Sequence, residues 1–106
     1  MLKKTERLSK QAFDTYYKTG KRIHTSHLQL IYTPHASFHG AVVVGKKVFK
    51  KAVDRNRLRR QLYSRLYTWK QSSSRVGVFI VIAKPSIKNL PKKDFTKELQ
   101  ALVGRL

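Results

Sequence analysis

The residues with the clearest chemical potential form one short basic segment, Arg55-Asn56-Arg57 followed by Arg59 and Arg60. A guanidinium group can bind a phosphate through two parallel hydrogen bonds. An asparagine amide can donate and accept at a base edge or a 2′-hydroxyl. The segment therefore carries the groups that RNA recognition uses.

These residues fall in a predicted helix, at about residues 53–69, that has two different faces. With about 100° of rotation per residue, its apolar residues share one narrow stripe that should face the core. The stripe consists of Leu58, Leu62, Leu66 and Trp69. A separate face is basic, polar and aromatic, and it consists of Asn56, Arg59, Arg60, Tyr63, Tyr67 and Lys70. Arg55 falls nearer the apolar stripe, in the first turn, so it either reaches outward or pairs internally.

A solvated charged face is the alternative for this helix. Such a face usually combines Lys with Glu four residues apart, whereas this helix has a single acid, Asp54, near its N-terminus. The tyrosines of the face add flat rings on which bases can stack. The composition of the face therefore favours contact with RNA.

The charge of the whole chain indicates the same class of partner. Its 106 residues include 24 Lys and Arg against 5 Asp and Glu, a net charge of +19 at pH 7. Solubility alone needs a net charge of about 2–8, so a polyanion should neutralise the excess. A membrane surface fits less well, because the charge is spread along the chain and is not gathered on one amphipathic helix or in a tail.

The remaining elements predict a single domain, residues 1–106, around one core, since 41% of the residues are hydrophobic. Further helices are predicted at residues 8–18 and 92–106, and strands at residues 21–33, 40–45 and 76–83. In the first strand, Leu28, Leu30 and Tyr32 alternate onto one face. A connector with four lysines, residues 46–51, precedes the basic helix. This order predicts an α+β fold with helices packed on one mixed sheet, and it leaves the strand order and the crossover hand open.

Other classes of protein fit less well. The chain has no cysteine, which excludes disulfides and thiolate metal sites. It has no apolar run of a signal peptide or of the about 20 residues that span a bilayer, so we expect a cytoplasmic protein with no membrane contact. A protein-only nuclease would need paired acid–base groups, but the histidines and acids are scattered, and we expect no catalytic or metal-binding residue on the chain. A ribosomal or other structural RNA-binding protein fits the composition fully and stays the alternative.

The connector and the basic helix resemble the signature of the bacterial ribonuclease P protein subunit. That family has two lysines, a short spacer, a basic pair, then Arg-Asn-Arg, an aliphatic residue and two more bases, and this chain has the same order from Lys46 to Arg60. Three other parts resemble the family's opening helix, the strand before the motif and the strand after the helix: Arg7-Leu8 with Phe13, Tyr17 and Gly20, residues 41–47, and residues 79–85. The likeness covers nearly the whole chain, which makes it far more specific than Arg-Asn-Arg alone.

The resemblance implies a fold and a function. The fold is a single-domain α/β sandwich with three helices, a four-stranded mixed sheet and a left-handed crossover through the basic helix. The function is that of the non-catalytic protein subunit of a ribonucleoprotein endoribonuclease, which removes the 5′ leader from precursor tRNA. The catalytic groups and most of the bound magnesium would belong to the catalytic RNA subunit. The protein would be a monomer in a 1:1 complex with that RNA and would also contact precursor tRNA.

The resemblance also implies site residues by position. Contacts to the catalytic RNA are expected from Lys46, Lys47, Lys50, Lys51, Arg55, Asn56, Arg57, Arg59, Arg60 and Tyr63. A cleft for the single-stranded leader is expected from Phe13, Tyr17 and Tyr32, since aromatic rings stack bases without requiring a sequence. Ordinary core packing is the alternative for Phe13 and Tyr17. Two positions depart from the family: Tyr63 stands where another base is common, and Arg75-Val76-Gly77 stands where an acid is common.

Overall fold

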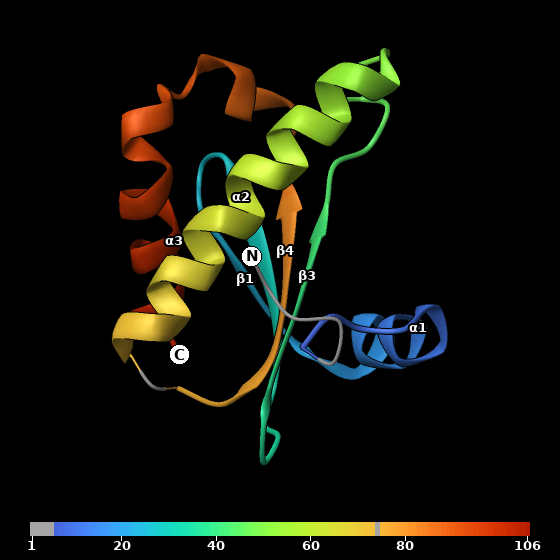
Figure 1. Cartoon of the computed structure of the whole chain (residues 1–106), viewed down its shortest axis with the longest axis vertical. Helices are drawn as coiled ribbons and strands as arrows, with labels where there is room; N and C mark the ends of the chain where they lie inside the picture. Colours follow the sequence, from blue (N-terminus) through green and yellow to red (C-terminus); the bar gives the residue numbers. More distant parts are fainter. Residues whose placement is uncertain (1–5, 74) are drawn as a thin grey trace.

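The computed structural model of the chain describes residues 6–73 and 75–106. Its elements in chain order are α1 (Lys10–Thr19), β1 (Lys21–His24), β2 (Leu28–Thr33), β3 (Phe38–Val43), α2 (Ala52–Ser73), β4 (Gly77–Ala83), the 3₁₀ turns η1 (Pro85–Asn89) and η2 (Lys92–Asp94), and α3 (Phe95–Val103) (Figure 1). The predicted order of helices and strands is confirmed. The segment at residues 21–33 differs from the prediction, because a turn divides it into two strands. The last helix begins as 3₁₀ turns, and α2 continues beyond Trp69 to Ser73.

The four strands form one mixed sheet in the order β1-β2-β4-β3. β2 pairs antiparallel with both β1 and β4, whereas β3 and β4 are parallel neighbours joined through α2. With α2 in front of the sheet and both strands running upward, β4 lies to the left of β3 (Figure 1). This is a left-handed crossover, which is rare. Helix α2 runs obliquely across the sheet (Figure 1). The α+β sandwich expected from the sequence is confirmed.

The sheet is covered on both faces, and β4 lies between two apolar layers. Phe79 and Val81 point to the larger core beneath α2 and α3, where they meet Leu62 of the predicted apolar stripe. Val78 and Ile80 point to a smaller layer against which α1 packs. A strand buried on both faces accounts for the continuous apolar run in the sequence.

Helix α1 sits on the smaller layer and has no fully buried residue. Ser9 caps it, because the Ser9 side chain accepts a hydrogen bond of 3.2 Å from the backbone N–H of Ala12. At its other end the N–H of Gly20 donates to the carbonyl oxygen of Tyr16. None of the helices in the described part of the chain combines the length and apolar composition that a bilayer span requires.

Candidate nucleic-acid interface

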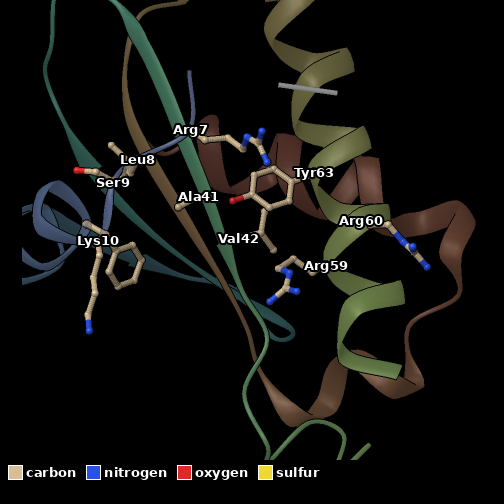
Figure 2. A pocket seen from close by; sticks show the side chains of 10 residues that line it. Arg7, Leu8, Ser9, Lys10, Ala41, Val42, Arg59, Arg60 and Tyr63 are labelled. Atoms are coloured by element: carbon tan, nitrogen blue, oxygen red, sulfur yellow. The ribbon is translucent and has the colours of Figure 1, made fainter. Parts of the chain in front are cut away.

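A groove of about 580 Å³ runs between the start of α1 and the side of α2. Its lining comes from three parts of the chain: Arg7, Leu8, Ser9, Lys10 and Phe13 on one side, Ala41 and Val42 of β3 on the floor, and Arg59, Arg60 and Tyr63 of α2 on the other side. Figure 2 shows Arg7 extending toward α2 and Tyr63 lying between α2 and β3, while Lys10 and Arg60 point outward at the edges. The groove thus combines an apolar floor and aromatic rings with four cationic side chains.

The outer wall of this groove is the N-terminal segment, which runs alongside β3. Arg7 forms a parallel bridge with Gly40, and the N–H of Gly40 donates a 2.8 Å hydrogen bond to the carbonyl oxygen of Glu6. The carboxylate of Glu6 forms an ion pair with the ammonium group of Lys70 on α2. This pairing fixes the wall to α2, and it means that Lys70 is partly neutralised although the helical wheel placed it on the basic face.

The connector between β3 and α2 presents its lysines to solvent. Val48 is 2% exposed and anchors the segment in the main core. The four lysines predicted to contact RNA are all exposed: Lys46, Lys47, Lys50 and Lys51. A buried anchor with exposed lysines on both sides of it places positive charge at the start of α2.

The first arginine of the motif, Arg55, forms hydrogen bonds within the protein. Its guanidinium donates hydrogen bonds to the carbonyl oxygens of Phe49 at 3.0 Å and Lys50 at 2.6 Å. Of the two orientations left open by the sequence, the structure has the internal one. Arg55 therefore holds the connector in place through Nη1, and its direct contact with RNA stays a prediction.

The other motif residues point in different directions around α2. The amide oxygen of Asn56 accepts a hydrogen bond from the guanidinium of Arg59, so these two side chains form one unit. Arg57 is exposed on the flank of α2 that faces η1 and α3. Arg60 borders both the groove and a shallow depression with Arg57 on the outer surface of α2. The motif thus spreads its charge over a wide arc of the helix.

Tyr63 lies where the family often has a basic residue, and it is half-buried. Its ring packs against the main core and also lines the groove. It therefore offers an apolar, aromatic surface, with a hydroxyl, where a cation would have offered charge. A stacking contact at this position is compatible with its orientation.

Two of the three predicted leader-binding rings lie together. Phe13 and Tyr17 stack with their ring centroids 5.7 Å apart, and the Arg22 guanidinium carbon lies 4.7 Å from the Tyr17 ring centroid. Phe13 lines the groove and packs on the small apolar layer, whereas Tyr17 is 40% exposed. Phe13 thus packs on the sheet and also borders the groove, and its contact with the leader stays a prediction.

Tyr32 does not join these rings, and the expected three-residue cleft is wrong in this respect. Its ring lies on the opposite face of the sheet, in the core beneath α2 and α3, with its centroid 5.1 Å from that of Phe79. The reason is the two-residue period of β2, which puts Tyr32 on the same face as Leu28 and Leu30 and turns Ile31 toward α1.

Sequence reasoning did not identify Arg7 and Lys10 as groove residues. Both are exposed and precede or begin α1. The signal available was the basic charge at the start of a predicted helix, and only the tertiary contact with β3 shows that this charge faces α2. Arg75, in the segment where the family often has an acid, donates a 3.4 Å hydrogen bond to the carbonyl oxygen of Val103.

Comparison with known proteins gives one consistent result. The model of the Ribonuclease P family matches residues 2–106. The ribonuclease P protein component of Microcystis aeruginosa is 36% identical over 101 residues, covering 89% of this chain and 83% of the relative. That of Nitratiruptor is 31% identical over 98 residues, covering 92% of this chain and 88% of the relative.

Solved structures show the same fold. A mutant of the Staphylococcus aureus RNase P protein superposes with a TM-score of 0.84 at 23% identity, covering 96% of this chain and 88% of that one. The Thermotoga maritima RNase P protein gives a TM-score of 0.81 at 20% identity, covering 95% and 97%. The chain therefore belongs to the family of ribonuclease P protein components, which act with an RNA subunit in the 5′ processing of tRNA.

Proposed function

We propose that this ribonuclease P protein component binds the catalytic RNA through the connector and α2, and the 5′ leader of precursor tRNA through the groove beside α1. The observation that carries the proposal is the groove itself. It brings Arg7 and Arg59 together from opposite sides, over a floor that is apolar, with the rings of Phe13 and Tyr63 within it. Such a channel tracks a phosphate backbone and offers flat surfaces to unpaired bases.

The side chains that line the groove indicate which subunit supplies the catalytic groups. The ten residues that line the groove include cations, aromatic rings and two hydroxyls, those of Ser9 and Tyr63, and among them there is no carboxylate or imidazole. Those are the groups that general acid–base catalysis uses most. We therefore assign the catalytic groups to the RNA subunit, with the protein as the subunit that binds and orients.

Magnesium is assigned on the same basis. Mg²⁺ prefers carboxylate and phosphate oxygens, and the cationic lining of the groove does not fit such an ion. We propose that the magnesium ions of the holoenzyme are held mainly by the RNA subunit. We further propose a 1:1 complex of one protein with one RNA subunit, acting in the cytoplasm.

Contacts to the RNA subunit are proposed for the exposed cations of the connector and of α2. These are Lys46, Lys47, Lys50, Lys51, Arg57, Arg59 and Arg60. Asn56 would act together with Arg59, to which it is hydrogen-bonded, and Arg55 would act through the connector. Phosphate contacts of this kind release counterions, so binding should weaken steeply as salt increases.

Reconstitution tests this function directly. The purified protein, the RNA subunit and both together are incubated with precursor tRNA at low magnesium concentration, and release of the leader is measured. We expect cleavage that depends on the RNA and is strongly enhanced by the protein. Cleavage by the protein alone would support a protein nuclease, and no enhancement would favour a structural RNA-binding protein.

The leader path has its own test at Tyr17. Replacing Tyr17 with Ala removes an exposed ring that is stacked on Phe13, and a stacked base contributes about 1–3 kcal/mol. We expect affinity for precursor tRNA to fall about fivefold or more, with little change for mature tRNA, while Tyr17→Phe retains the stack and the affinity. Equal losses for both RNAs would indicate a folding defect in place of a leader contact.

A further inference from the structure

A second cavity lies on the other flank of α2, away from the groove. Its volume is about 330 Å³, and it is enclosed by the connector, by the first turns of α2 and by the segment from η1 to the start of α3. Arg57 and Gln61, which are four residues apart and therefore share one side of the helix, border it. Ligand pockets span about 300–1,000 Å³, so this one suits a single small ring system.

The base of the cavity is apolar and one wall is aromatic. Leu58, Ile87 and Phe95 are each at most 5% exposed and form part of the main core beneath it. Phe49 is half-buried, borders the cavity, and has the ammonium group of Lys88 5.4 Å from its ring centroid. A flat ligand with an apolar face would be accommodated against this wall.

Two polar side chains border the cavity without a partner. Asp54 and Gln61 are both partly buried. Across residues 6–73 and 75–106, neither side chain takes part in an ion pair or a side-chain hydrogen bond, whereas the carboxylates of Glu6 and Glu98 are engaged. The carboxylate of Asp54 is therefore available to accept hydrogen bonds from a donor that enters the cavity.

The charges around the opening of the cavity are positive, opposite in sign to that of Asp54. Arg57 of α2, Lys88 of η1 and Lys92 of η2 come from three different elements and border the same cavity. Cations at the rim would attract phosphates, while the carboxylate of Asp54 disfavours entry of a phosphate itself. This arrangement fits a neutral hydrogen-bond donor that is carried on a phosphate backbone.

We propose that this cavity binds an unpaired guanine base of an RNA strand, with Phe49 beside the ring and Asp54 at its Watson–Crick edge. Guanine presents the ring N1–H and the 2-amino group side by side, and a carboxylate can accept from both. Uracil presents one N–H between two carbonyl oxygens, which would face the same carboxylate unfavourably. Unpaired bases are the part of an RNA that proteins recognise by sequence. The inference rests on the proposed function in that it takes RNA as the partner, and it adds a base-specific site to it.

Direct binding to short RNAs tests the site. Fluorescence anisotropy of the full chain is measured with three labelled pentanucleotides, UUGUU, UUIUU and UUUUU, where I is inosine, which lacks the 2-amino group. We expect UUGUU to bind about tenfold more tightly than UUIUU, since hydrogen bonds to a charged group are the strong ones, and UUUUU to bind most weakly. Equal affinities for all three would overturn the proposal. Because the comparison is between ligands, it holds for the unaltered protein.

Two variants test whether Asp54 is responsible for the preference for UUGUU over UUIUU. Asp54→Asn should reduce the preference for UUGUU over UUIUU to about threefold or less. Asp14→Asn, on exposed α1, makes the same change of charge outside the cavity and should leave the preference intact. Loss of the preference in both variants, or in neither, would overturn the assignment to Asp54.

The outcomes also separate this site from the proposed function. Base-independent binding together with a functional holoenzyme would overturn the guanine site and leave the proposed function standing. Absence of binding to both the pentanucleotides and the ribonuclease P RNA would overturn the proposed function, and the guanine site with it.

Discussion

The guanidinium of Arg55 donates a 2.6 Å hydrogen bond to the backbone carbonyl oxygen of Lys50, so the first arginine of the basic motif closes the connector onto α2. A second hydrogen bond, to the carbonyl oxygen of Phe49, strengthens the closure. The side chain of Lys50 meanwhile faces solvent. Within the motif, Arg55 therefore fixes the conformation of the connector, whereas Asn56 and Arg57 are exposed on the surface.

Replacing Arg55 with Ala should lower stability as well as RNA affinity. Two hydrogen bonds from a charged, half-buried group are lost, which corresponds to about 1–3 kcal/mol in the free energy of unfolding. Arg57→Ala is the matched control, because Arg57 is exposed and should change stability by less than about 0.5 kcal/mol while still weakening RNA binding. Urea denaturation at fixed salt measures the first effect. Equal stability of the two variants would show that Arg55 does not anchor the connector in solution.

Two cations on α2 should differ in their effect on the salt dependence of RNA binding. Arg60 is exposed at the edge of the groove, and its loss in Arg60→Ala should reduce the slope of log affinity against log salt by about 0.7–0.9. Lys70 is paired with Glu6, so Lys70→Ala should change the slope by much less. Titrations of the ribonuclease P RNA at several salt concentrations give both slopes. A larger change for Lys70→Ala would mean that the ion pair opens when RNA binds.

Gly77 has a backbone conformation that favours glycine over other residues. Its φ is +133°, and a Cβ there would lie 2.6 Å from Cε1 of Tyr32. Gly77→Ala should therefore cost about 2–4 kcal/mol, from backbone strain and from displacement of the tyrosine ring. At Gly45 a Cβ would meet no atom within 4 Å, so Gly45→Ala should be near neutral. Thermal unfolding of the two variants compares them, and similar melting temperatures would contradict this account.

Local patterns in the sequence predicted much of the fold. The helical period of Leu58, Leu62 and Leu66 identified the buried stripe of α2, and all three are at most 5% exposed. A strand was also predicted at residues 76–83, and β4 lies there, buried on both faces. The turn between β1 and β2 was missed because residues 25–27 contain neither Gly nor Pro. That turn is held by Glu98, 73 residues away from Thr25 in the chain, which no local pattern can reveal.

The candidate site was also predicted only in part, because local patterns do not show contacts between residues that are distant in the chain. The strand alternation placed Tyr32 on one face with Leu28 and Leu30, which is correct, whereas assignment by resemblance placed it in the leader cleft. Which face α1 covers depends on tertiary packing and not on strand period. The wheel likewise put Arg55 near the apolar side, where its internal hydrogen bonds are found. Arg7 and Lys10 could be found only once the N-terminal segment had been placed beside β3.

Glu98 should prove to be the most important acid for stability in this strongly basic chain. One of its carboxylate oxygens accepts hydrogen bonds from the Thr25 hydroxyl at 2.6 Å and from the backbone N–H of His27 at 3.0 Å. Glu98→Ala leaves the N–H of His27 without its partner in a partly buried turn, so a loss of about 2–3 kcal/mol is expected. Glu98→Gln keeps an acceptor and should lose less. Gln100→Ala, on the exposed side of α3, serves as the control and should be near neutral. Urea denaturation of the three variants at one salt concentration should rank them in this order. If Glu98→Ala unfolded at the same urea concentration as Gln100→Ala, the tie between α3 and the β1–β2 turn would contribute nothing to stability.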